Sequence, residues 1–120
     1  MKRSLLFSIL LTAIGCSKPA PQLDGVDLKL WKDDPKGCKN TRIAFADFLR
    51  NQKDKLKGLD ERSLTSVLGQ PDRKDLSEHH GKVYQYFLSP GPDCEGTDSV
   101  SLSLVVRFNA TGVSREVAIE

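Results

Sequence analysis

Apolar and polar residues alternate along positions 99–108, near the end of the chain. The apolar set, which we expect to face a hydrophobic core, is Val100, Leu102, Leu104, Val106 and Phe108. The positions between them hold serines, Val105 and Arg107. Such alternation predicts a half-buried antiparallel strand with one face on the core.

Three further segments have the pattern of strands. Residues 82–88, which carry both tyrosines of the chain, predict a strong strand, and residues 73–77 predict a weaker one at the edge of a sheet. The sequence Asn-Ala-Thr-Gly at 109–112 predicts a hairpin turn that leads into a final strand at 113–119.

Two amphipathic helices are expected before these strands. The first spans residues 41–57, with an apolar stripe on one side and basic residues on the other, and with Asn40 or Thr41 as its N-cap. The second begins after Asp60, whose carboxylate can accept from free backbone N–H groups, and ends at Gly69, where a left-handed backbone can stop a helix.

Two helices followed by an antiparallel meander indicate the α+β class. We expect the two N-terminal helices to pack on a three- to four-stranded antiparallel β-meander as a two-layer sandwich. Residues 26–31, before the helices, predict a short strand or a single helical turn. The lone tryptophan, Trp31, is expected to plug the core, with ligand stacking as the alternative.

The first sixteen residues have the pattern of an export signal. Two basic residues precede an apolar run that is too short to span a bilayer comfortably, and the run ends in Ala-Ile-Gly-Cys at 13–16. This motif resembles the lipobox of bacterial lipoprotein precursors, which implies cleavage before Cys16 and lipidation of that residue. The expected divisions are a lipoprotein signal peptide (1–15), a lipidated cysteine with a flexible tether (16–27) and one folded domain (28–120).

Removal of the signal balances the charge of the chain. The sequence holds 18 Lys and Arg against 16 Asp and Glu, and Lys2 and Arg3 leave with the signal, so that 16 of each sign remain. A balanced chain argues against a nucleic-acid partner and against electrostatic attachment to anionic lipid. Membrane attachment is therefore expected through the acyl chains on Cys16.

Two cysteines, Cys38 and Cys94, remain in the mature chain. In an oxidising compartment such a pair usually forms a disulfide. The bond would close a loop of about 57 residues and stabilise the fold by roughly 4 kcal/mol in the chain-entropy account. Metal ligation is the alternative, and it needs further His, Cys or carboxylate ligands nearby.

The sequence offers little for catalysis. The only histidines, His79 and His80, are adjacent in an expected turn, where their side chains point in different directions, so solvated turn residues are favoured over a metal site or a general base. Asp33 and Asp34 fit either a cation site or the turn chemistry around Pro35. We expect no catalytic residues, no metal, no cofactor and no small-molecule substrate.

One feature favours a binding protein. If the even-numbered residues of the two central strands face the helices, then Val83, Phe87 and Val105 point outward on neighbouring strands. An exposed apolar cluster of this kind is a candidate protein-binding surface. The alternative is that Trp31 and the N-terminal arm fold over these side chains.

The order of these features resembles a known family. After the lipobox and tether come the motifs Leu59-x4-Leu64-x2-Val67-Leu68-Gly69-x-Pro71-Asp72, Tyr84-x-Tyr86 and Leu102-x-Leu104-x-Val106-x-Phe108-x3-Gly112-Val113. Over residues 56–119 this pattern resembles the SmpA/OmlA-type small outer-membrane lipoproteins, the family of the BamE subunit of the β-barrel assembly machine.

The resemblance implies a helix-helix-sheet fold and a non-enzymatic assembly or scaffolding role. We expect a lipid-anchored interaction protein that faces the periplasm from the outer membrane, with the inner membrane and the cell surface as other destinations. Its expected partner is another envelope protein. The alternative is a lipoprotein-borne inhibitor or ligand-binding module, since proteins with tandem copies of this fold bind and inhibit β-lactamases.

Overall fold

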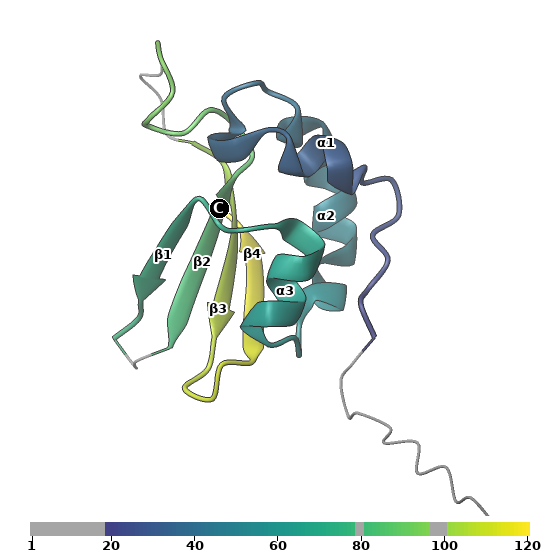
Figure 1. Ribbon diagram of the computed structural model, residues 1–120, viewed down its shortest axis with the longest axis vertical. Coiled ribbons are helices and arrows are strands. Elements are labelled where there is room, and N and C mark those ends of the chain that lie inside the picture. Colours follow the sequence, from purple (N-terminus) through teal and green to yellow (C-terminus); the bar gives the residue numbers. More distant parts are fainter. Residues whose placement is uncertain (1–18, 79–80, 97–100) are drawn as a thin grey trace, which may run out of the picture.

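The structure, a computed structural model, describes residues 19–78, 81–96 and 101–120 (Figure 1). Helical segments occupy the first part of the described chain and strands occupy the second. The helical elements are α1 (Leu28–Lys32), α2 (Ala46–Gln52), α3 (Glu61–Leu68) and the 3₁₀ turns η1 (Pro35–Gly37), η2 (Arg42–Phe45) and η3 (Lys53–Leu56). The strands are β1 (Arg73–Leu76), β2 (Lys82–Phe87), β3 (Ser103–Phe108) and β4 (Ser114–Ile119).

The four strands form one antiparallel sheet in the order β1-β2-β3-β4. The helices all lie on one side of this sheet (Figure 1). The predicted α+β class and the antiparallel meander are therefore confirmed. The even-numbered side chains of β2 and β3 face the helices and, apart from the exposed Lys82, are buried, as the alternation predicts: Tyr84, Tyr86, Leu104, Val106 and Phe108. Positions 97–100, where the third strand was expected to begin, lie outside the described residues.

Helix α3 has the two ends that the sequence predicts. The Asp60 carboxylate accepts from the backbone N–H of Ser63 at 2.7 Å, and Gly69 ends the helix with a φ of +79°. Leu59, before the cap, and Leu64, in the helix, are both buried, which matches the spacing of a hydrophobic staple. Local signals therefore set both ends of this helix.

The expected continuous helix over residues 41–57 is wrong. The segment consists of η2, α2 and η3, and the backbone leaves helical geometry at Gln52, where φ is −122°. The side-chain amide of Gln52 accepts from Asp24 N and donates to Asp24 O, both at 2.7 Å. These bonds tie the N-terminal arm to the break in the helix.

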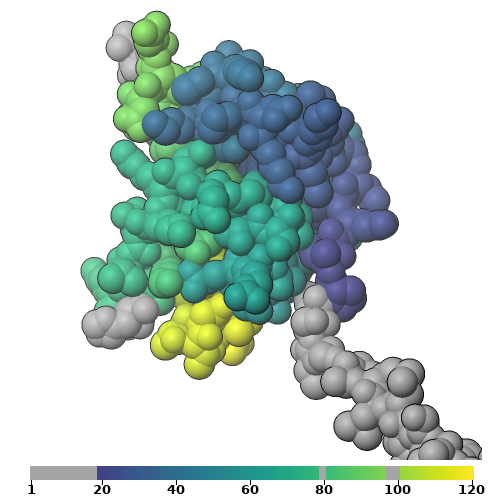
Figure 2. All heavy atoms as spheres, viewed as in Figure 1, coloured from purple at the N-terminus to yellow at the C-terminus, as the bar shows by residue number. Residues whose placement is uncertain are grey.

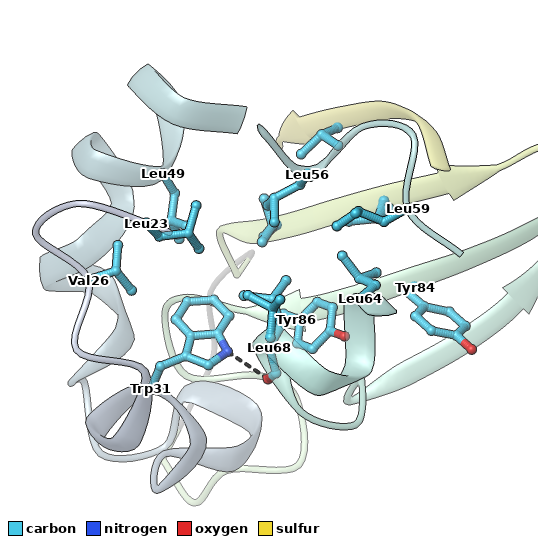
Figure 3. Packing of buried hydrophobic residues seen from close by; sticks show 14 of the residues in the cluster. Leu23, Val26, Trp31, Leu49, Leu56, Leu59, Leu64, Leu68, Tyr84 and Tyr86 are labelled. Carbon is cyan, nitrogen blue, oxygen red and sulfur yellow. Dashed lines mark hydrogen bonds between the residues drawn. The ribbon is translucent and has the colours of Figure 1, made fainter. Parts of the chain in front are cut away.

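The packed part of the chain begins before residue 28. Leu23 and Val26, in the segment expected to be a tether, are 7% and 9% exposed and lie beside Leu49 and Trp31 in the core (Figure 3). Asp27 caps α1 by accepting from Lys29 N and Leu30 N. Residues 28–32 are thus helical, which decides between the two structures that the sequence left open.

Trp31 plugs the core, as expected. Its indole is fully buried and its ring centre lies 6.0 Å from that of Tyr86. The indole N–H donates to the carbonyl of Leu68 at 2.9 Å, the last residue of α3 (Figure 3). The tryptophan therefore joins α1 to α3 on the helix side of the sheet, and no solvent-facing surface of the ring remains for ligand stacking.

A buried ion pair ties the helical layer to the sheet. Arg42 and Asp72, whose side chains are 3% and 5% exposed, meet at 2.7 Å. Arg42 Nε also donates to the carbonyl of Trp31 at 2.9 Å, and its guanidinium lies 4.6 Å from the indole centre. Asp72 accepts in addition from the backbone N–H of Phe87 at 2.8 Å and of Lys36 at 2.9 Å.

The N-cap expected from Asn40 or Thr41 is absent, since no side chain of the segment itself caps η2. Its place is taken by Asp34, which is fully buried. The Asp34 carboxylate accepts from Thr41 N at 2.9 Å and Arg42 N at 3.2 Å, and also from Lys39 N at 2.7 Å. Asp34 is thus a cap that acts from outside the segment.

Candidate functional site

Val83, Phe87 and Val105 lie on the sheet face away from the helices, but they do not form an open apolar cluster. Phe87 is 4% exposed and Val105 is 6% exposed, so the expected exposure of these two side chains is wrong. Cover by Trp31 is wrong as well, because Trp31 packs on Tyr86 at the opposite face. Phe87 and Val105 are buried on the outer face of the sheet, apart from the core between sheet and helices.

Neighbours in the sheet and in the segment after β2 explain this burial. The guanidinium of Arg73 lies 5.7 Å from the ring centre of Phe87, and the backbone of Gly91 is so close that a Cβ there would lie 2.9 Å from the ring. Val105 sits on a central strand, with Gln85 and Ala118 opposite it on either side. Side chains on the two neighbouring strands therefore shield Val105 from solvent on the outer face.

The other predicted site residues divide into two groups. Cys16, His79 and His80 lie outside the described residues. Cys38 and Cys94 are bonded as a disulfide, with Cα atoms 5.5 Å apart.

The described ranges hold no group of three or more His, Cys, Asp or Glu that could hold a metal ion. Within the same ranges, no helix has both the length and the apolar character needed to cross a membrane. The Asp34 oxygens accept from backbone N–H groups, which accounts for that residue as a structural cap.

The structure points to a different surface, at strand β1. All four residues of β1 are exposed, and Leu76 is 72% exposed. β1 is the edge strand farthest from the helices (Figure 1), and β1 and β2 form one margin of the molecule (Figure 2). Lys74 and Leu76 share the helix-side face with Tyr84, because Lys74 and Tyr84 are register partners. That face is left uncovered where it reaches the edge.

Two shallow hollows adjoin at Lys82. One, of about 440 Å³, is lined by Lys74, Asp75, Leu76 and Lys82. The other, of about 240 Å³, is lined by Lys82, Glu61 and the end of β3 with the turn after it, residues 108–112. We call the residues around Lys82 the β1 edge site, and its members are Glu61, Lys74, Leu76, Lys82 and Tyr84.

Charged groups of the β1 edge site interact closely. The Glu61 carboxylate accepts from the Tyr84 hydroxyl and lies 3.1 Å from Lys82 Nζ. The Tyr84 hydroxyl and then Lys82 hold the pKa of Glu61 below its usual value, against the opposing effect of burial. The Lys74 ammonium lies 5.3 Å from the Tyr84 ring centre, a cation–π distance. The site is therefore a mixed surface of fixed charges and one exposed leucine.

Both tyrosines are expected to resist ionisation in the folded protein. Burial, and then the Glu61 carboxylate, raise the pKa of Tyr84 to about 12, and burial raises the pKa of Tyr86 as well. The folded state therefore holds these protons more tightly than the unfolded state. That contribution to stability is complete below the ordinary pKa of 10 and is lost as the pH rises toward 12.

An ultraviolet titration of tyrosinate absorbance checks this expectation. The folded protein should show almost none at pH 10, where free tyrosine is half ionised. Glu61→Gln should lower the pKa of Tyr84 toward, but not to, its ordinary value, because burial remains. Two tyrosines that titrate near pH 10 while circular dichroism stays native would contradict the structure.

Sequence reasoning missed the β1 edge site. The signal was present in residues 73–77, which predicted a weak edge strand with charges and one leucine, but nothing in the sequence shows that the helices stop short of that strand. Comparison of the chain with models of protein families, with curated proteins and with solved structures found no match.

Proposed function

We propose that this chain is a lipid-anchored, non-catalytic interaction protein of the bacterial cell envelope, of the SmpA/OmlA kind. The lipobox that ends at Cys16 supports the anchor, and the Cys38–Cys94 disulfide suits an oxidising compartment. The observation that carries the interaction role is the open helix-side face of β1, where Leu76 is 72% exposed. Unpaired backbone groups at a sheet edge can pair with another chain, and Leu76 adds an apolar contact beside them.

Photo-cross-linking in living cells tests this proposal. A photoreactive phenylalanine analogue is placed at Leu76 in the anchored protein, in the bacterium that produces it. We expect a discrete adduct with one envelope protein after irradiation, because a partner at the β1 edge would lie within reach of this side chain. The readout is a shifted band on a blot and its identification by mass spectrometry.

The chain offers a matched control at Leu30, an exposed leucine on α1 that is 48% exposed. The analogue at Leu30 should not give the same adduct. Cys16→Ala should lose fatty-acid labelling, which tests the anchor separately. Identical adducts from both positions, or no adduct from Leu76 at native expression, would refute an interaction role for this surface.

A further inference from the structure

The backbone of β1 has unused hydrogen-bonding groups. Ser77 N donates to Gly81 O at 2.7 Å at the end of the β1–β2 ladder. In an antiparallel pair alternate residues bond to the neighbouring strand, so the odd-numbered residues of β1 bond to β2. Lys74 and Leu76 therefore direct their N–H and C=O groups away from β2, toward the free edge.

The chain covers the start of its other edge strand with its own backbone. Ser114, the first residue of β4, donates to Leu59 O and accepts from Gly58 N, both at 2.8 Å. The segment before α3 therefore covers the start of β4. No such segment lies along β1 in the described part of the chain, where β1 is outermost (Figure 1).

A second copy of the chain is a poor occupant for this edge. Two identical antiparallel strands related by a two-fold axis place one residue opposite itself, and on β1 the central residue is Lys74 or Asp75. Either choice brings like charges face to face, which destabilises a strand pair. A register centred on Leu76 avoids that clash, but it sets Asp75 and Lys74 opposite Ser77 and Glu78, which lie beyond the end of β1. The charges and the short length of β1 thus favour a partner of different sequence.

We propose that the β1 edge accepts an extended segment of another envelope protein as an added antiparallel strand. The partner strand places a carboxylate against Lys74 and an apolar side chain against Leu76 on the helix side. The residue between them faces Asp75 on the other side and is basic. Read from its N-terminus, the segment is therefore apolar, basic, acidic. Strand addition of this type draws affinity from the backbone and selectivity from alternate side chains. This inference rests on the proposed function and names the chemistry of the partner.

The test uses the mature lipoprotein in detergent with its disulfide intact. The probe is the capped peptide Val-Thr-Leu-Lys-Glu-Thr-Val, and fluorescence anisotropy measures its binding. We expect saturable binding that weakens about tenfold in Lys74→Glu and in Leu76→Ser. The Leu30→Ser protein, in which another exposed leucine, on α1, is replaced, should bind as the wild type does.

Two further measurements separate strand addition from side-chain adhesion. A peptide N-methylated at the Leu and Glu backbone nitrogens should lose binding, and the reversed triplet Glu-Lys-Leu in the same flanks should bind about tenfold less well. Amide hydrogen exchange at Lys74 and Leu76 should slow when the first peptide is bound. Equal binding of the N-methylated or reversed peptide, or unchanged exchange at both amides, would overturn the inference.

The outcomes distinguish this inference from the proposed function. An adduct at Leu76 in cells, together with no peptide binding in vitro, leaves the interaction role standing and overturns strand addition. Peptide binding with all its controls, together with no adduct in cells, supports the strand site and refutes its use in the envelope.

Discussion

Arg42→Met is expected to lower the free energy of unfolding by about 3–5 kcal/mol, the usual cost of removing one member of a buried ion pair. Methionine keeps most of the volume and the contact with the Trp31 ring but removes the charge. Asp72, 5% exposed, would then hold a buried carboxylate without its guanidinium. Two backbone donors, from Lys36 and Phe87, would still face it, but they do not neutralise it.

Urea denaturation followed by circular dichroism measures this loss, and Arg50→Met is the matched control. Arg50 pairs with Asp47, but the two side chains are 51% and 89% exposed, so its replacement should change stability by less than about 1 kcal/mol. In Arg42→Met combined with Asp72→Asn, the loss should be smaller than the sum of the single losses, because the buried charge is gone. Equal stability of Arg42→Met and Arg50→Met would show that the ion pair does not hold the helical layer on the sheet.

Local patterns predicted the parts of this fold that depend on neighbours in the chain. Helix α3 carries its cap, its stop and its apolar positions within ten or so residues, and the alternation in residues 102–108 determined which side chains of β3 enter the core. The disulfide also followed from the count of two cysteines and from the expected oxidising compartment. These features need no knowledge of how distant segments meet.

The features that sequence reasoning missed depend on distant contacts. Asp34 caps η2 from outside that segment, and Gln52 breaks the expected helix because its amide binds the backbone of Asp24, 28 residues earlier. The N-terminal arm enters the core through Leu23, which no periodicity identifies in so short a segment. At Gln52 the tertiary contact overrides helix propensity, and in the other two cases a distant contact supplies what no local pattern shows.

The candidate site was misjudged for a related reason. Alternation correctly put Phe87 and Val105 on the outer face of the sheet. The face on which a side chain lies does not determine how exposed it is, because residues on flanking strands can bury a side chain in the middle of the sheet. Leu76 is the opposite case. Its side chain is on the helix side of the sheet but is exposed, because β1 is an edge strand that the helices do not reach. Exposure in a small sheet depends on which strands are at its edges and on where the helices end.

Replacement of both Cys38 and Cys94 by serine is expected to lower the free energy of unfolding by up to about 4 kcal/mol. The bond joins residues 56 positions apart, and closing so long a loop restricts the unfolded chain strongly. Other contacts hold the same region in the native state, including the bond from Gly91 N to Lys36 O at 3.0 Å. We therefore expect a native circular dichroism spectrum with a lower urea midpoint.

Reduction of the wild-type protein should reproduce that midpoint, and a reductant should leave the serine variant unchanged. Mass spectrometry of the unreduced mature protein should find no alkylatable thiol at Cys38 or Cys94. A chelator should not change the urea midpoint of the unreduced wild-type protein, because the bond to Cys94 leaves Cys38 no thiolate to give to a metal. The serine variant has no thiol at either position and should not respond either. Two alkylatable thiols in protein isolated from the envelope, together with a urea midpoint that falls when a chelator is added, would indicate a metal site in place of the disulfide. The disulfide would then no longer support an oxidising compartment.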